Sequence, residues 1–273
     1  MIRTHKHILS ALLASFVSLT PFLVHAQTAA SEIGVVVIHG KGGSPNAWVI
    51  DLAQALEFEN HQVSNLEMPW SRNRHYDVDV KAAEGEITAA LDTLRNKGAK
   101  KFFVAGHSQG GWFALHYGGQ QKIDGLIAIA PGGQVDSPPF LRELGEHVAR
   151  ARSMVGAGRG NENATFADFE SSRGTNPITT TAAIYLSWFD PDRTQTSGVA
   201  SKVKQGIPVL YVAPTGDYPG LTKNKLTYFK ALPENPLTRL YEPEASHMEA
   251  PAASSNEIIR WIGEVSLQAA QGQ

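Results

Sequence analysis

The chain of 273 residues contains no cysteine. This absence excludes a disulfide framework, a thiolate nucleophile, a cysteine-ligated zinc site and an iron–sulfur cluster. The sequence also lacks an excess of either charge, because 24 basic side chains are set against 26 acidic ones. Composition therefore gives no general reason to expect nucleic-acid binding. Any covalent catalysis must use serine, threonine, lysine, aspartate, glutamate, histidine or tyrosine.

Charged residues make up only 18% of the chain, whereas apolar residues make up 42%. This balance favours a packed hydrophobic core and argues against disorder. The length allows one large domain or two small ones.

The first 26 residues have the pattern of a secretory signal peptide. Two basic residues precede an apolar stretch from Ile8 to Val24, and small residues occupy the last and third-last positions before a cut after Ala26. A membrane anchor is the alternative, but the stretch is short for a spanning helix and contains Pro21. We therefore expect a mature chain that begins at Gln27, is periplasmic or secreted, and keeps no stable membrane anchor.

Residues 27–273 alternate between two kinds of segment. Segments expected to be strands, the clearest being the β-branched run at 32–39, alternate with segments that have helical spacing of apolar residues. This alternation predicts an α/β fold with a mostly parallel sheet of about six strands and helices on both faces. The expected strands are 32–39, 61–68, 101–105, 124–130, 207–213 and 237–241, and the expected helices are 46–60, 79–97, 112–117 and 252–267.

The segment from about 134 to 206 is too long for a simple connection between two strands. Two stretches with helical character, 140–154 and 179–188, flank a segment rich in glycine and asparagine. We interpret 134–206 as a helical cap that is inserted into a single domain and covers the ends of the strands.

A Gly-x-Ser-x-Gly motif with Ser108 at its centre directly follows an apolar strand and directly precedes a helix. In that context the serine occupies a sharp, strained turn, and side chains at positions 106 and 110 would collide, so both residues are glycine. The hydroxyl is then exposed at the positive end of a helix, where it would act as a nucleophile. A glycine-rich turn with an incidental serine is the alternative.

A serine nucleophile needs a base, and the base needs a group that orients it. Asp217 follows the fifth strand and His247 follows the sixth, which is the order Ser, Asp, His expected on such a sheet. Asp190 and Asp192 are rivals of Asp217, but they precede the fifth strand. A surface histidine in a loop is the alternative interpretation of His247.

The loop after the first strand, 39–43, contains three glycines and would supply part of an oxyanion hole. One donor would be the backbone N–H of Gln109, the residue after the nucleophile. The second would come from Lys41 or Gly42. The alternative is that the loop is only a tight glycine-rich turn at the end of the first strand and has no catalytic role.

The mature chain resembles the α/β-hydrolase superfamily from Ile33 to about Trp261. The resemblance implies a serine hydrolase that cleaves a small-molecule carboxylic ester through an acyl-enzyme on Ser108, without a metal or organic cofactor. Many members have eight strands, but the two antiparallel strands that often open the sheet are missing here, which leaves about six. The resemblance rests on HGKGG at 39–43, GHSQGG at 106–111, Asp217 and His247.

The same side chains are compatible with other activities. An acyltransferase, an amidase or peptidase, and a cofactor-free perhydrolase would each use them. A non-catalytic binding protein that keeps the fold comes from a different class, and the complete set of serine, aspartate and histidine argues against it.

Two groups of residues are candidates for substrate binding. The first consists of apolar residues of the cap that would line the acyl side, although packing of the cap helices on one another explains them equally well. The second lies in the loop after the second strand, where an arginine would hold an anionic part of the substrate, unless it pairs with Asp77, Asp79 or Glu84. The cap candidates are Phe140, Ile184, Tyr185, Leu186 and Trp188, and the loop candidates are Trp70, Arg72 and Arg74.

Overall fold

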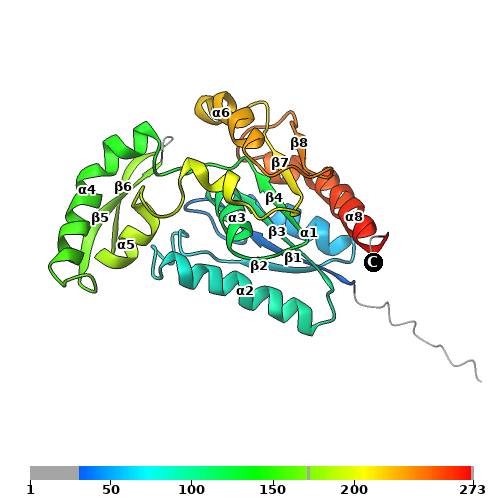
Figure 1. Cartoon of the computed structure of the whole chain (residues 1–273), viewed down its shortest axis with the longest axis horizontal. Coiled ribbons are helices and arrows are strands. Elements are labelled where there is room, and N and C mark those ends of the chain that lie inside the picture. Colours follow the sequence, from blue (N-terminus) through cyan, green and yellow to red (C-terminus); the bar gives the residue numbers. More distant parts are fainter. Residues whose placement is uncertain (1–30, 171–172, 272–273) are drawn as a thin grey trace, which may run out of the picture.

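The computed structural model describes residues 31–170 and 173–271, and the expected signal peptide, 1–26, lies outside these residues. Its centre is a sheet of six parallel strands in the order β2-β1-β3-β4-β7-β8 (Figure 1). The predicted α/β fold, with about six strands, is confirmed. The strands are β1 (Ile33–Ile38), β2 (Gln62–Leu66), β3 (Lys101–His107), β4 (Gly125–Ile129), β7 (Val209–Val212) and β8 (Arg239–Tyr241).

Helices cover both faces of this sheet. In β1, Val35 and Val37 belong to the hydrophobic cluster shared with α1 and α8, whereas Val36 and Ile38 belong to the cluster shared with α2 and α3. All four side chains are completely buried, as expected of a central parallel strand. The helices around the sheet are α1 (Ile50–Phe58), α2 (Val80–Asn96), α3 (Gln109–Gln120), α6 (Pro219–Lys230), α7 (Ala250–Ala253) and α8 (Ser255–Gln271).

Helix α6 was not predicted from the sequence. None of its residues is buried, so it lacks the apolar face that makes a helix recognisable in a sequence. Along the chain, α6 lies between β7 and β8. It begins beyond the carboxyl end of β7, at the same edge of the sheet where β3 ends in the Gly-x-Ser-x-Gly motif (Figure 1).

The segment between β4 and β7 forms a lobe at the left of Figure 1. The lobe contains two helices, at positions close to those expected, and an antiparallel hairpin that the sequence analysis did not foresee. Residues 179–181, expected to be helical, end a strand instead. The elements are α4 (Pro138–Gly156), β5 (Asn163–Glu170), β6 (Gly174–Thr181) and α5 (Ala182–Phe189), followed by the short 3-10 helix η1 (Ser197–Lys202).

The hairpin is stabilised by packing on the helix that follows it, α5, rather than by a strong apolar pattern of its own. Phe166 in β5 is buried and stacks on Tyr185 of α5, with 4.3 Å between the ring centres. Strand β6 is mostly exposed and rich in threonine, so it shows no clear alternation of apolar residues. The side chain of Thr181 then accepts a hydrogen bond from the Ile184 amide and begins α5.

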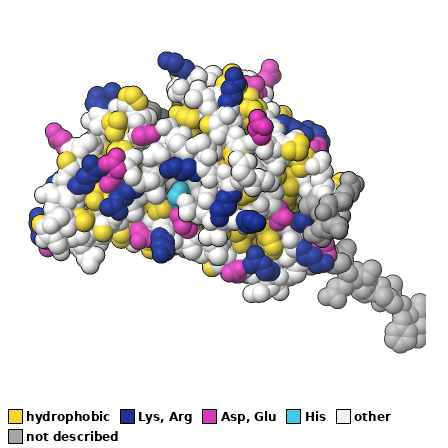
Figure 2. Space-filling view, in the orientation of Figure 1, with side chains coloured by type: hydrophobic (Ala, Val, Ile, Leu, Met, Phe, Trp, Pro, Cys, Tyr) yellow, Lys and Arg dark blue, Asp and Glu magenta, His cyan; other side chains and the backbone are white. Residues whose placement is uncertain are grey.

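Lysine and arginine side chains are interspersed with aspartate and glutamate over the face seen in Figure 2, in keeping with the net charge of −2. Among residues 31–170 and 173–271, no helix combines the length and the apolar character needed to cross a membrane.

Candidate active site

Ser108 lies in a sharp turn between β3 and α3, with φ 55° and ψ −119°. A Cβ atom at Gly106 would lie 2.1 Å from the carbonyl oxygen of Gly110, and one at Gly110 would lie 2.6 Å from the carbonyl oxygen of His39. Both contacts involve backbone atoms that cannot move aside, so the turn requires glycine at these positions. The strained backbone holds the serine side chain where it can enter a cavity.

The structure brings Ser108, Asp217 and His247 together. Nε2 of His247 lies 2.9 Å from Oγ of Ser108, and Nδ1 lies 2.7 Å from Oδ1 of Asp217. Because the carboxylate of Asp217 can only accept, Nδ1 carries the proton and Nε2 is left to accept from the serine hydroxyl. The His247 and Asp217 side chains are only 7% and 4% exposed, so water screens their interaction little.

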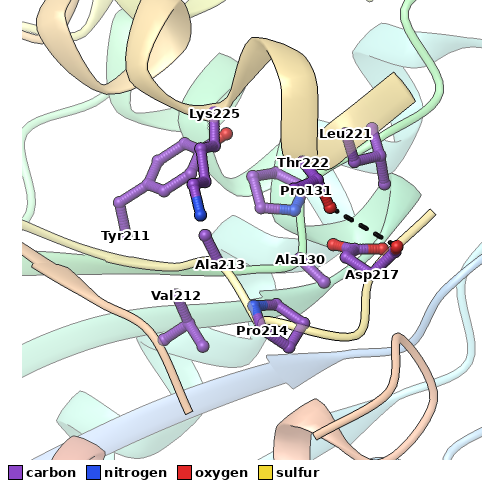
Figure 3. A pocket seen from close by; sticks show the side chains of 10 residues that line it. All are labelled: Ala130, Pro131, Tyr211, Val212, Ala213, Pro214, Asp217, Leu221, Thr222 and Lys225. Atoms are coloured by element: carbon purple, nitrogen blue, oxygen red, sulfur yellow. Dashed lines mark hydrogen bonds between the residues drawn. The ribbon is translucent and has the colours of Figure 1, made fainter. Parts of the chain in front are cut away.

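The loops that carry the histidine and the aspartate are joined to each other. The amide of Gly216 donates to the carbonyl of Ala245, so the segment after β7 runs parallel to the segment after β8. Figure 3 shows the surroundings of Asp217, where the hydroxyl of Thr222 on α6 donates to the Asp217 carbonyl oxygen at 3.4 Å. The rival carboxylates, Asp190 and Asp192, both pair with Arg152 inside the cap.

His107 is a site residue that the sequence analysis did not single out. Its Nε2 lies 2.8 Å from the carbonyl oxygen of His247, and since a carbonyl can only accept, Nε2 carries the proton. Burial, together with the nearby His247, lowers the pKa of His107 to about 3, so the ring is neutral at ordinary pH. Its position directly before the nucleophile, at the end of a buried strand, was the available signal.

The loop at 39–43 is held against the end of β2 by a defined set of hydrogen bonds. The amide of Met68 donates to Nε2 of His39 at 3.0 Å, so Nδ1 carries the proton and donates to the Gly40 carbonyl at 2.7 Å. Burial lowers the pKa of His39, which keeps this tautomer neutral. The indole of Trp70 donates to the His39 carbonyl at 2.8 Å.

The structure separates the two candidates for the second oxyanion donor. The amide of Gly42 already donates to the carbonyl of Trp70 at 2.9 Å, so it is not available for a substrate. The loop passes close to the serine, because a Cβ atom at Gly40 would lie 3.0 Å from the Cβ of Ser108. Lys41, the next residue, is therefore the better candidate.

A cavity of about 440 Å³ opens above Ser108 and His247. The cap contributes Phe140 from α4 and Phe169 from β5, and the segment around α6 contributes Tyr218 and Leu221. The walls are mainly apolar, so the cavity suits a small apolar ligand.

Of the expected cap residues, only Phe140 lines this cavity. The packing interpretation holds for Trp188, which is 1% exposed and lies 5.6 Å from Trp70 between ring centres. The expected substrate contact of Trp70 is also wrong, because that ring is 2% exposed and its N–H is already bonded. The other expected cap residues belong to α5 and do not line the cavity: Tyr185 and Leu186 are buried in the core, and Ile184 packs against it half-buried.

The expected anchoring role of the loop arginines is not supported by their positions. Arg74 pairs with Glu86 at 2.7 Å and with Asp77 at 3.0 Å, so its charge is already matched inside the protein. Asp77 was one of the expected partners, whereas Glu84 binds His116 instead. Arg72 is exposed and does not line the cavity.

Within the described part of the chain, no group of three or more histidine, aspartate or glutamate side chains is arranged to hold a metal ion.

The sequence of residues 35–257 matches the family model of the Alpha/beta hydrolase family. No curated protein sequence is similar enough to be counted as a relative. Several solved structures share the fold. The structure reported for LipS and LipT, two metagenome-derived lipolytic enzymes, has a TM-score of 0.59 and 17% identity over 87% of this chain and 95% of that one.

Two further solved structures are similar over most of their length. The monoacylglycerol lipase of Paleococcus ferrophilus has a TM-score of 0.59 and 20% identity, over 85% of this chain and 94% of that one. Est1E from Butyrivibrio proteoclasticus, with ferulic acid bound, has a TM-score of 0.55 and 15% identity, over 86% of this chain and 88% of that one. At these identities the likeness shows the fold alone.

Proposed function

The chain belongs to the Alpha/beta hydrolase family, and we propose that it is a serine hydrolase that cleaves a carboxylic ester through an acyl-enzyme on Ser108. The observation that carries this proposal is the unbroken line of hydrogen bonds from Asp217 through His247 to Ser108 at the wall of the cavity. The lipolytic enzymes and the monoacylglycerol lipase of the same fold support an ester as the substrate.

In the first half of the reaction, Oγ of Ser108 attacks the ester carbonyl while Nε2 of His247 takes the hydroxyl proton. The carbonyl oxygen becomes an oxyanion, which accepts hydrogen bonds from the backbone N–H groups of Gln109 and Lys41. Asp217 keeps the imidazole in the required tautomer and stabilises its positive charge. The tetrahedral intermediate then collapses, and the alcohol leaves with the proton held by His247.

In the second half, water replaces the alcohol. His247 takes a proton from the water as it attacks the acyl carbonyl, and returns it to Oγ of Ser108 when the acid leaves. The serine is thereby regenerated.

The cavity favours a small and neutral substrate. Its walls are mainly apolar, and Lys41 is the one lysine or arginine among the described residues that line it. That lysine is already paired with Asp168 at 2.5 Å, so it does not offer a free charge to an anionic substrate. An uncharged ester with an apolar acyl group fits these walls best.

The function is tested with a fluorophosphonate probe and a panel of neutral p-nitrophenyl esters of increasing acyl length. We expect the probe to label Ser108 and the esters to be hydrolysed, with both activities abolished in Ser108→Ala. A folded wild-type protein that takes up no probe and cleaves no ester would contradict the proposal.

We also propose that the protein is exported. The support is the pattern of the first 26 residues, with a basic start, an apolar stretch and small residues before the cleavage site.

A further inference from the structure

The side chain of Lys41 leaves the loop at 39–43 and enters the cap. Its Nζ lies 2.5 Å from Oδ1 of Asp168 and 3.1 Å from the carbonyl oxygen of Phe169, both on the hairpin strand β5. The same Nζ lies 5.1 Å from the centre of the Phe140 ring in the cavity wall. The Lys41 and Asp168 side chains are only 13% and 9% exposed, so the pair is largely removed from water.

Asp168 is connected in turn to the other side of the site. Its second oxygen, Oδ2, accepts a hydrogen bond from the hydroxyl of Tyr76 at 3.0 Å. That hydroxyl also lies 3.4 Å from Oε1 of Gln109, the residue that follows the nucleophile. Burial and the Asp168 carboxylate raise the pKa of Tyr76 well above its ordinary value, so the hydroxyl remains a donor.

The backbone of Tyr76 is also fixed to the hairpin. The hydroxyl of Thr180 on β6 donates to the Tyr76 carbonyl at 2.9 Å, and Tyr76 itself has a φ of 57°. Both strands of the hairpin therefore contact this residue, which comes from the loop after β2. The loop that was expected to bind an anionic substrate joins the cap to the main domain instead.

We infer that the ion pair between Lys41 and Asp168 couples the cap to the oxyanion hole, with both residues acting as positioning residues. The inference rests on the proposed function, because it concerns the two backbone N–H groups that would bind the oxyanion. The two donors belong to Lys41 and Gln109, and Asp168 contacts Lys41 directly and Gln109 through Tyr76. A displacement of the hairpin would thus move the residues that carry both donors.

The ion pair can affect the position of the oxyanion donor because Lys41 carries both the paired side chain and the donating backbone N–H. Hydrogen bonds of His39 and Gly42 hold the loop on either side of Lys41, but its glycine neighbours allow the Lys41 peptide more conformations than other residues would. A lysine side chain held at its end by a buried carboxylate restricts the Lys41 backbone from outside the loop. Oxyanion stabilisation depends on donors that are already in place before the reaction, so this restriction bears directly on kcat.

The test uses the double variant Lys41→Met/Asp168→Asn of the full chain. It removes both charges together, so neither is left buried without a partner, and the introduced amide would keep an oxygen acceptor for Tyr76. The variant retains the backbone N–H of residue 41. Any loss of kcat therefore reflects a change in the position of this donor and not its removal. We expect kcat for a neutral p-nitrophenyl ester to fall by about 10- to 100-fold, part of the roughly 10²–10³-fold effect of losing a donor, while KM changes by less than about threefold.

Two single variants serve as controls. Lys41→Arg keeps a cation opposite Asp168 and is the conservative rescue, so we expect its kcat to lie above that of the double variant. Arg152→Met removes an ion pair that lies within the cap and does not reach the loop, and Asp190 keeps Arg193 as a partner at 3.3 Å. We expect this variant to have the wild-type kcat. A folded double variant with unchanged kcat, or an equal loss in Arg152→Met, would overturn the coupling.

Amide hydrogen exchange supplies a readout that does not require catalysis. The amides of Gly42 and Gly43 are hydrogen-bonded in the loop, and we expect them to exchange roughly tenfold faster in the double variant. If the wild-type protein has no esterase activity, the proposed function fails and exchange alone decides the coupling, with unchanged rates counting against it. If the double variant does not fold, Lys41→Met replaces it, because Asp168 then keeps the Tyr76 hydroxyl and the Phe169 amide as donors. The same fall in kcat is expected, and an unchanged value would again contradict the coupling.

Discussion

His107 and His247 are joined through a hydrogen bond from the imidazole Nε2 of the first to the backbone carbonyl of the second, with 2.8 Å between the atoms. The residue directly before the proposed nucleophile thus supports the backbone of the proposed base. The two rings also lie close, with 5.0 Å between their centres. A charge on His107 would therefore oppose the positive charge that His247 acquires during the reaction, so a neutral His107 suits the mechanism.

The buried state of His107 makes stability depend on pH. The pKa of His107 is about 3 in the folded protein, against an ordinary value of 6.5. As the pH falls below 6.5, the unfolded chain binds a proton that the folded protein cannot accept, so the free energy of unfolding decreases until about pH 3. The free energy of unfolding, measured in urea between about pH 7 and pH 5, should therefore fall with decreasing pH in the wild-type protein. Below about pH 6 this fall should be smaller in His107→Gln, by about 1.4 kcal/mol per pH unit.

Glutamine at position 107 can still donate to the His247 carbonyl but does not titrate, so it isolates the effect of charge. A wild-type protein whose pH dependence matches that of His107→Gln would contradict the assignment of a neutral, buried His107.

The proposed catalytic residues should act as a unit. Ser108→Ala, His247→Ala and Asp217→Ala should each lower kcat for p-nitrophenyl esters by at least about 10³-fold, because each breaks the same chain of proton transfer and orientation. The double variants should lose little more. Near wild-type turnover in Asp217→Ala would move the acid role to another carboxylate.

The glycines of the turn should differ sharply from an exposed glycine. Gly106→Ala places a Cβ 2.1 Å from a backbone oxygen, so we expect a loss of about 3 kcal/mol or more in the free energy of unfolding. The matched control is Gly85→Ala in the exposed face of α2, where a Cβ meets no atom within 4 Å. That variant should gain roughly 0.5–1 kcal/mol. Equal stabilities in urea melts would refute the steric argument.

Substrate length should depend on Phe140 and not on Trp188. Phe140→Ala enlarges the cavity beside Ser108 and should shift the preferred p-nitrophenyl ester towards longer acyl chains. Trp188→Phe removes a hydrogen bond to the Val78 carbonyl, so it should lower stability by roughly 1–3 kcal/mol and leave the chain-length profile unchanged. A shifted profile in Trp188→Phe alone would return that residue to the substrate site.

Export is tested by N-terminal sequencing of protein from the periplasm or the medium. We expect the mature chain to begin at Gln27, because cleavage needs small residues before the site. Ala26→Phe should block cleavage and leave the precursor uncut. An intact Met1 on a membrane-bound form of the wild-type protein would contradict the signal peptide.

Most strands of the sheet were predictable because they are short local runs of apolar residues, the clearest being Val35–Ile38. The convergence of Ser108, Asp217 and His247 was predictable for a related reason. Each residue follows the end of a parallel strand, and such ends share one edge of the sheet. Local sequence therefore determined both the fold class and which three side chains meet.

The roles of the remaining residues were decided by tertiary structure. Trp188 and Arg74 were candidates for substrate contact, yet one packs in the core and the other pairs with Glu86, a partner twelve positions away. Lys41 was foreseen only as a backbone donor, and its partner Asp168 is 127 residues distant, on a hairpin that the sequence did not indicate. Periodicity reports which face of an element is apolar, but it holds no information on which distant side chain will lie opposite. Only the folded chain sets those pairings, because they depend on packing between elements far apart in the sequence.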